Sequence, residues 1–250
     1  MLRRRVITSE RFFIALASVA TLVGCATEHW NGRVERWGSL GEAFRDGKTE
    51  GRVRLAHVTR KPHGYGVGAL EGLLGEVLIL DGDAWVARRE GTDVHVRRVV
   101  DGDPWGATLL AVAYVPRWRD VSVDRPLDPA EFEGFLADRG RASGLAPPFP
   151  FLVEGSFDSI EFHVVEGSCP MADSEPGAPP RRSAARTTLA AVKGTLVGFF
   201  AEHSAGVLTH HGSRTHIHVL IPSASGEPHL GHVDAVTLQA GCVLRLPVTR

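Results

Sequence analysis

The sequence predicts a β-dominated α+β protein of two packed sheets, mixed or antiparallel, with few short helices. Apolar runs of strand length recur along most of the chain, turns containing glycine separate them, and helical patterns are short. The 250 residues are 43% hydrophobic and 23% charged, a globular composition that excludes a disordered chain or a coiled coil. The formal net charge of -1 argues against a nucleic-acid-binding protein, because such proteins neutralise phosphates with Lys and Arg.

The first 24 residues have the features of an export signal. A basic start, Arg3 to Arg5, precedes an uncharged apolar run over residues 12–23, which is shorter than the roughly 20 residues that span a bilayer. The run ends in Leu-Val-Gly-Cys, which resembles the lipobox of bacterial lipoproteins. That resemblance implies a lipid on Cys25 and an exported chain anchored at the cell envelope, at the outer membrane because Ala26 rather than Asp follows. The alternative is a plain cleaved signal in which Cys25 is incidental.

Residues 25–50 are expected to form a polar lead-in with a short amphipathic helix, and a β-rich N-terminal subdomain is expected over residues 51–146. Alternating or continuous apolar residues predict its strands, and an Asp-Gly dipeptide at 81–82 predicts a hairpin with a primed turn. Apolar residues at helical spacing predict a helix with Asp128 as its N-cap. The expected strands cover residues 53–58, 75–80, 84–87, 94–100 and 107–115, and the helix covers residues 129–139.

A C-terminal β-rich subdomain is expected over residues 147–250, because the proline-rich stretch 144–150 interrupts the preceding pattern. Residues 167–187 are rich in Pro, Ser, Ala and Arg and are typical of a surface loop. Strands are expected at residues 194–200, 215–221, 232–238 and 243–246. Export permits a disulfide between Cys169 and Cys242, and two separate buried thiols are the equal alternative.

Seven of the 12 histidines lie between residues 203 and 232. His216 and His218 are two apart on a predicted strand, so their side chains point to one face. An antiparallel hairpin centred on residue 225 places residue 232 opposite residue 218, which brings His232 beside them. Three converging imidazoles with open positions are typical of a catalytic divalent-metal site. If the register of the hairpin is shifted, His229 would take the place of His232. The alternative without a metal is that these histidines lie on a solvent-exposed face of the strand.

Several short motifs, in this order, resemble the α-acetolactate decarboxylase family. They occupy residues 63–82, 103–107, 193–199, 215–218 and 231–233. The resemblance implies decarboxylation of 2-acetolactate to acetoin with zinc held by His216, His218 and His232, although three imidazoles also accept other divalent ions. It implies a small 2-hydroxy-3-keto acid as the partner and a homodimer as the assembly.

Glu76 falls at the family's pocket glutamate, so the resemblance implies that it orients the metal-bound water or the substrate hydroxyl. An exposed glutamate at the start of a strand is the alternative interpretation, and Glu71 is a neighbouring candidate that we expect to be solvated. The adjacent pair His210 and His211 is expected in a loop and in contact with solvent only.

Three departures from the family pattern bear on activity. Leu152 stands where the family has an arginine that can hold a substrate carboxylate. The chain ends at Arg250, without the family's C-terminal extension that supplies another glutamate, and the loop between His218 and His232 is slightly long. Arg214 is a candidate for the missing charge. These departures favour two alternatives, a non-catalytic metal- or small-ligand-binding lipoprotein and an enzyme acting on a less acidic substrate.

Overall fold

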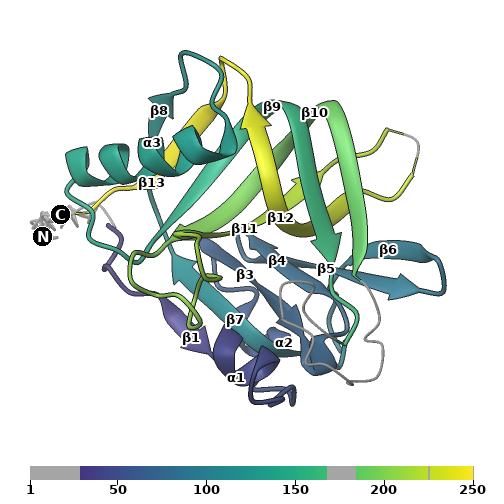
Figure 1. The fold of residues 1–250 in the computed structure, drawn as a ribbon. Coiled ribbons are helices and arrows are strands. Elements are labelled where there is room, and N and C mark those ends of the chain that lie inside the picture. The colour runs from purple at the N-terminus through teal and green to yellow at the C-terminus, as the bar shows by residue number, and fades with distance from the viewer. Residues whose placement is uncertain (1–28, 168–183, 225, 250) are drawn as a thin grey trace, which may run out of the picture.

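The computed structural model describes residues 29–167, 184–224 and 226–249. It contains two antiparallel sheets and few short helices (Figure 1), which confirms the predicted β-dominated α+β class. The export signal, Cys25 and Cys169 lie outside the described residues. Within the described part of the chain, no helix is both long enough and apolar enough to cross a membrane.

The first sheet has seven antiparallel strands in the order β1-β7-β3-β4-β5-β6, with β2 also paired to β7. The turn between β4 and β5 has positive φ at Asp81 (50°) and Gly82 (86°), as a primed hairpin turn requires. The hairpin predicted there is therefore confirmed. The strands are β1 (Glu35–Trp37), β2 (Val53–Arg54), β3 (Gly64–Leu70), β4 (Glu76–Leu80), β5 (Asp83–Glu90), β6 (Asp93–Arg98) and β7 (Gly106–Tyr114).

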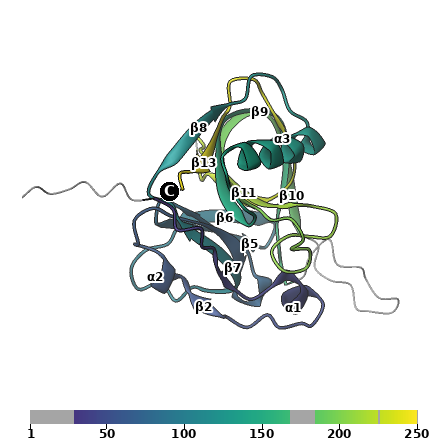
Figure 2. The same ribbon diagram turned by 90° about the vertical axis from the view of Figure 1, so that its left-hand side faces the viewer.

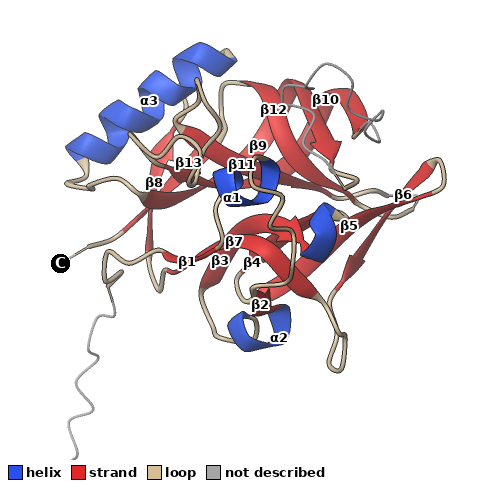
Figure 3. Cartoon of the chain, turned by 60° about the horizontal axis from the view of Figure 1, so that its bottom comes forward, coloured by secondary structure: helices blue, strands red, loops and turns tan. Residues whose placement is uncertain are grey.

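Two short α-helices and a 3-10 turn accompany this sheet (Figure 3): α1 (Leu40–Phe44), α2 (Leu55–Val58) and η1 (Glu71–Leu73). The helix expected within residues 25–50 is α1. The prediction of a strand over residues 53–58 is wrong after Arg54, where α2 begins. Leu55 and Val58 are three residues apart, and a helical turn lets both bury their side chains on one side.

The second sheet has six strands in the order β10-β11-β12-β9-β13-β8, and β9 also pairs with β10. This extra pairing closes β9, β10, β11 and β12 into a small barrel, seen as a ring in Figure 2. Although β8 precedes residue 147, it pairs with β13, so the two sheets divide between β7 and β8. The strands are β8 (Trp118–Ser122), β9 (Phe149–Val164), β10 (Ala185–Phe200), β11 (Thr215–Ile221), β12 (His229–Leu238) and β13 (Val243–Pro247).

Helix α3 (Pro129–Ala142) lies on the outside of the second sheet next to β12 (Figure 1). Asp128 and Glu131 form a capping box at its start, which confirms the predicted N-cap. The helix buries Phe132 and Leu136, and the ring of Phe132 contacts that of Phe151 edge to face at 5.9 Å.

The two sheets pack face to face, and one hydrophobic cluster joins them. Val67 and Leu78 of the first sheet belong to the same buried cluster as Leu152 and Val197 of the second. Leu152 pairs with Val197, and Val197 pairs with His218, so these residues share one face of the second sheet. The histidines on that face therefore point toward β4 of the first sheet.

Candidate metal centre

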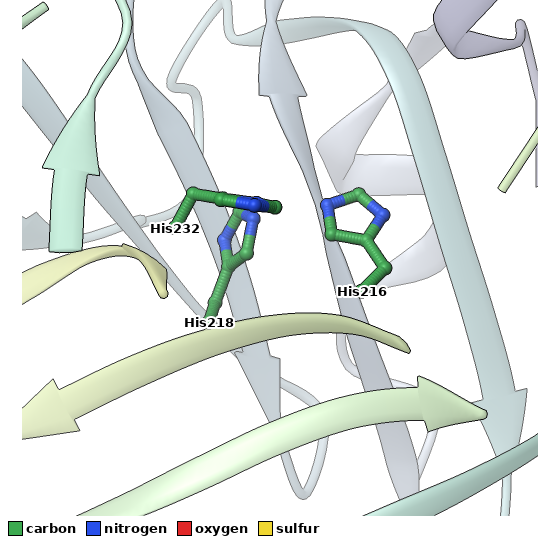
Figure 4. A group of neighbouring side chains, drawn as sticks. All are labelled: His216, His218 and His232. Atoms are coloured by element: carbon green, nitrogen blue, oxygen red, sulfur yellow. The ribbon is translucent and has the colours of Figure 1, made fainter. Parts of the chain in front are cut away.

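Strands β11 and β12 bring three histidines together. His218 is the register partner of His232, as the hairpin centred on residue 225 predicts, and His216 lies two residues before His218 on the same face. One ring nitrogen of each histidine lies within 4.8 Å of those of the other two. Figure 4 shows the three imidazoles turned toward one another. His216 and His218 are buried, whereas His232 has intermediate exposure.

The surroundings keep these rings uncharged. Burial lowers the pKa of His216 to about 3, and it lowers the pKa values of His218 and His232 well below the ordinary value. Neutral imidazoles have the free lone pairs that a metal ion needs. Among the described residues, Nδ1 of His216 and both ring nitrogens of His218 have no hydrogen-bond partner. Because unsatisfied buried nitrogens destabilise a fold, a divalent cation fits this donor set.

Glu76 places a carboxyl group beside the three histidines from the other sheet. It is 3% exposed, and its Oε1 accepts a hydrogen bond of 3.0 Å from the backbone N–H of Val165. Its Oε2 lies 3.6 Å from Nε2 of His218. Burial raises the pKa of Glu76 to about 7. The alternative interpretation of Glu76 as an exposed glutamate is therefore wrong. Glu71 is exposed, as expected.

His163 and Asp234 belong to the same cluster, although the sequence analysis did not identify them. His163 is the register partner of His232 on β9, is 2% exposed, and has its ring centroid 5.0 Å from that of His232. Its Nδ1 lies 2.9 and 3.0 Å from the two carboxylate oxygens of Asp234, which also accepts a hydrogen bond of 2.7 Å from Arg186. Strands β9 and β12 are distant in sequence, so no local pattern reveals this contact.

His210 approaches the centre from the loop between β10 and β11. Its ring centroid lies 5.3 Å from that of His232 and 6.0 Å from that of Phe44 in α1. The expectation that His210 contacts only solvent is therefore wrong, whereas His211 is exposed. Helix α3 holds the end of the loop through Glu133, which accepts hydrogen bonds from Ser213 and Arg214 of the loop and from Thr215 at the start of β11.

Among the described residues, two cavities adjoin the cluster. The smaller, about 20 Å³, lies among the histidines and Glu76, and apolar side chains such as Leu40, Phe44 and Leu109 complete its wall. The larger, about 280 Å³, opens between α3, β11 and β12. His210 and His232 line both cavities, so the larger cavity adjoins the three-histidine group.

The remaining candidates lie away from the centre or are already paired. Leu152 is buried in the hydrophobic core, two strands from His218. Arg214 forms ion pairs with Glu133 and Glu202. The slipped register is wrong, because His229 pairs with Ile221 and is exposed. Cys242 is a buried free thiol.

Comparisons with known proteins agree with this fold. The family model described as Alpha-acetolactate decarboxylase matches residues 38–245. An alpha-acetolactate decarboxylase from Bacillus subtilis strain 168 superposes with a TM-score of 0.66 at 18% identity, covering 86% of this chain and 85% of that chain. A Staphylococcus aureus protein of unknown function, similar to alpha-acetolactate decarboxylase, has a TM-score of 0.61 at 19% identity with the same coverages. A comparison with curated proteins gave no match.

Proposed function

Because the chain belongs to the alpha-acetolactate decarboxylase family, we propose that it is a zinc-dependent lyase that converts 2-acetolactate, a 2-hydroxy-3-keto acid, into acetoin and carbon dioxide. The observation that carries the proposal is the group of His216, His218 and His232 with Glu76 beside it. Three neutral imidazoles are typical ligands of catalytic zinc and leave a position for substrate. Other divalent ions of similar preference are expected to bind as well.

The chemistry needs a group that stabilises negative charge as carbon dioxide leaves. When bound, a divalent cation supplies this stabilisation as a Lewis acid. His216, His218 and His232 would hold the cation. Glu76 is placed to accept a hydrogen bond from the substrate hydroxyl or from water, and its carboxyl group is one that can hold or release a proton at this position. The apolar wall of the small cavity excludes bulk water from the reacting carbon.

One observation favours a second function, a non-catalytic protein that binds a metal or a small ligand. Among the described residues that line the two cavities, none is Lys or Arg. Leu152 is apolar and buried, and Arg214 is paired with Glu133. Within the described part of the chain, the cavity walls therefore offer a substrate carboxylate no lysine or arginine side chain, which suits an uncharged ligand or a less acidic substrate equally well.

The deciding experiment measures acetoin and carbon dioxide from 2-acetolactate with the zinc-loaded protein. We expect product above the spontaneous rate, and loss of that product with a chelator or in His218→Ala. His229→Ala is the matched control, because His229 is an exposed histidine on the same hairpin and should leave activity unchanged. Zinc bound in stoichiometric amount without product would establish the binding protein instead.

We also propose that the chain is exported and carries lipid on Cys25, and that it forms homodimers. The first proposal rests on the lipobox-like sequence, and the second on the family resemblance. Metabolic labelling with a fatty acid should mark the wild-type chain but not Cys25→Ser. Light scattering of the purified protein would measure the mass of the assembly.

A further inference from the structure

We infer that the side of the molecule where the described chain begins is a docking surface for an anionic phospholipid membrane. Three exposed arginines define this surface: Arg33, Arg117 and Arg119. The choice of a membrane as the partner rests on the proposed lipid on Cys25, because that lipid would bring this side to the bilayer. The attraction between the arginines and anionic headgroups needs no lipid, so it can be measured separately.

Trp30 fixes the point at which the N-terminal segment leaves the folded body. It is 4% exposed and belongs to the hydrophobic cluster that joins the two sheets. Its backbone N–H donates to the carbonyl of Val248 at 2.9 Å, and the N–H of Val248 donates to that of Arg117 at 3.0 Å. Strand β13 leads to this side of the molecule, at the left of Figure 1, which Figure 2 turns toward the viewer.

The connection between Cys25 and this fixed point is short. Cys25 is five residues before Trp30 in the sequence. Five residues span at most about 18 Å, however they are arranged. A lipid on Cys25 would therefore hold Trp30 within that distance of the bilayer, and the burial of Trp30 prevents the connection from lengthening. The side of the body next to Trp30 would then face the lipid headgroups.

The three arginines on this side are available for binding. The carbonyl of Arg33 accepts a hydrogen bond of 3.3 Å from the indole of Trp30, which places this residue beside the exit point. Arg117 continues the pairing of β8 with β13, and Arg119 is two residues further along, so both side chains point to one side of the strand. Among the described residues, none of the three arginines forms an ion pair.

Acidic side chains nearby leave this positive charge in place. Asp120 points to the other side of β8, where it pairs with Arg245 at 3.3 Å. Asp124 follows the far end of that strand. Glu35 on β1 is followed directly by Arg36, so these two charges offset each other. Anionic headgroups are the complement of the remaining arginines, and a flat bilayer can contact all three at once.

The test measures binding to vesicles by sedimentation. The protein is the chain from residue 25 onward with Cys25→Ser, which carries no lipid and contains every element of both sheets. We expect it to bind vesicles of phosphatidylglycerol and phosphatidylcholine at low salt, to dissociate as salt is added, and to ignore vesicles of phosphatidylcholine alone. Because each basic side chain near an anionic membrane changes binding about fivefold, Arg33→Gln should weaken it by that factor and Arg117→Gln/Arg119→Gln about 25-fold.

The double variant Arg97→Gln/Arg98→Gln is the matched control. It removes the same charge from β6, at the opposite end of the molecule in Figure 1, and should weaken binding by less than about twofold. Equal effects of the two double variants, or no preference for the anionic vesicles, would overturn the inference.

A second arm uses the wild-type protein as processed and purified from cells. If Cys25 carries lipid, this protein should also bind the neutral vesicles. Failure to bind them would refute the lipid on Cys25 and leave the comparison of the arginine variants intact, so the two failures are distinguishable.

Discussion

The buried carboxyl of Glu76 provides a quantitative test of the centre. Its pKa is about 7 in the folded chain, against an ordinary value of 4.5. The folded metal-free protein therefore holds this proton more tightly than the unfolded chain does. Its stability should fall as the pH rises from 4.5 to 7, and it should level off above that. The difference of about 2.5 pKa units corresponds to about 3 kcal/mol at high pH.

Glu76→Gln removes the charge but retains an oxygen that can accept the N–H of Val165. In metal-free protein at pH 8.5, we expect the variant to be more stable than the wild type by about 3 kcal/mol. At pH 5 the wild-type carboxyl is already protonated, so the advantage should shrink to about 1 kcal/mol or less. With zinc bound, the cation stabilises the carboxylate, and the advantage should disappear or reverse.

Urea unfolding at pH 5, 7 and 8.5, with chelator and with zinc, measures these differences. Subtracting wild type from variant at each pH removes the contributions of other titrating groups. Glu71→Gln, at an exposed neighbouring position, is the control for the loss of one carboxyl group at the surface. A stability difference for Glu76→Gln that does not change between pH 5 and pH 8.5 would show that this carboxyl does not ionise in a buried site, and the assignment of Glu76 would fail.

Three further predictions follow from the same structure. Metal-free protein should lose stability as the pH falls from 6.5 toward 3, because His216 takes up a proton at a higher pH in the unfolded chain than in the folded chain. Urea unfolding should show a smaller loss of stability with pH for His216→Leu than for the wild type, and an equal loss would contradict this. Leu152→Arg should destabilise the fold by about 3 kcal/mol or more without creating activity, since the position lies in the core; a stable variant with increased acetoin formation would contradict that placement. Gly231→Ala should lower both melting temperature and zinc affinity, because a Cβ there would lie 2.6 Å from the carbonyl oxygen of His163; unchanged values would refute the tight approach.

Local features of the fold were predictable because neighbouring residues determine them. The Asp81-Gly82 turn needs only two residues that tolerate positive φ, and the cap of α3 needs only Asp128 and Glu131. The register of the β11–β12 hairpin follows from where its turn is centred, so the pairing of His218 with His232 could be predicted as well. These features account for the sheet class and for the three-histidine group.

Features that depend on long-range packing were not predictable from the sequence alone. Residues 53–58 were expected to form one strand, yet Leu55–Val58 is helical because two of its side chains fill the first sheet's core. His163 reaches the centre through pairing with a strand about 70 residues away, and the bulge at Asp234 has no sequence pattern of its own. The burial of Glu76 likewise depends on how the two sheets meet.

The division of the centre between two sheets has a consequence for how the protein matures. The imidazoles come from β11 and β12, whereas the carboxyl comes from β4. A nascent chain that has formed the second sheet alone thus possesses all three histidines of the group but lacks the carboxyl group beside them. The complete centre forms only when the two sheets dock, so zinc uptake during refolding should begin before the two halves join.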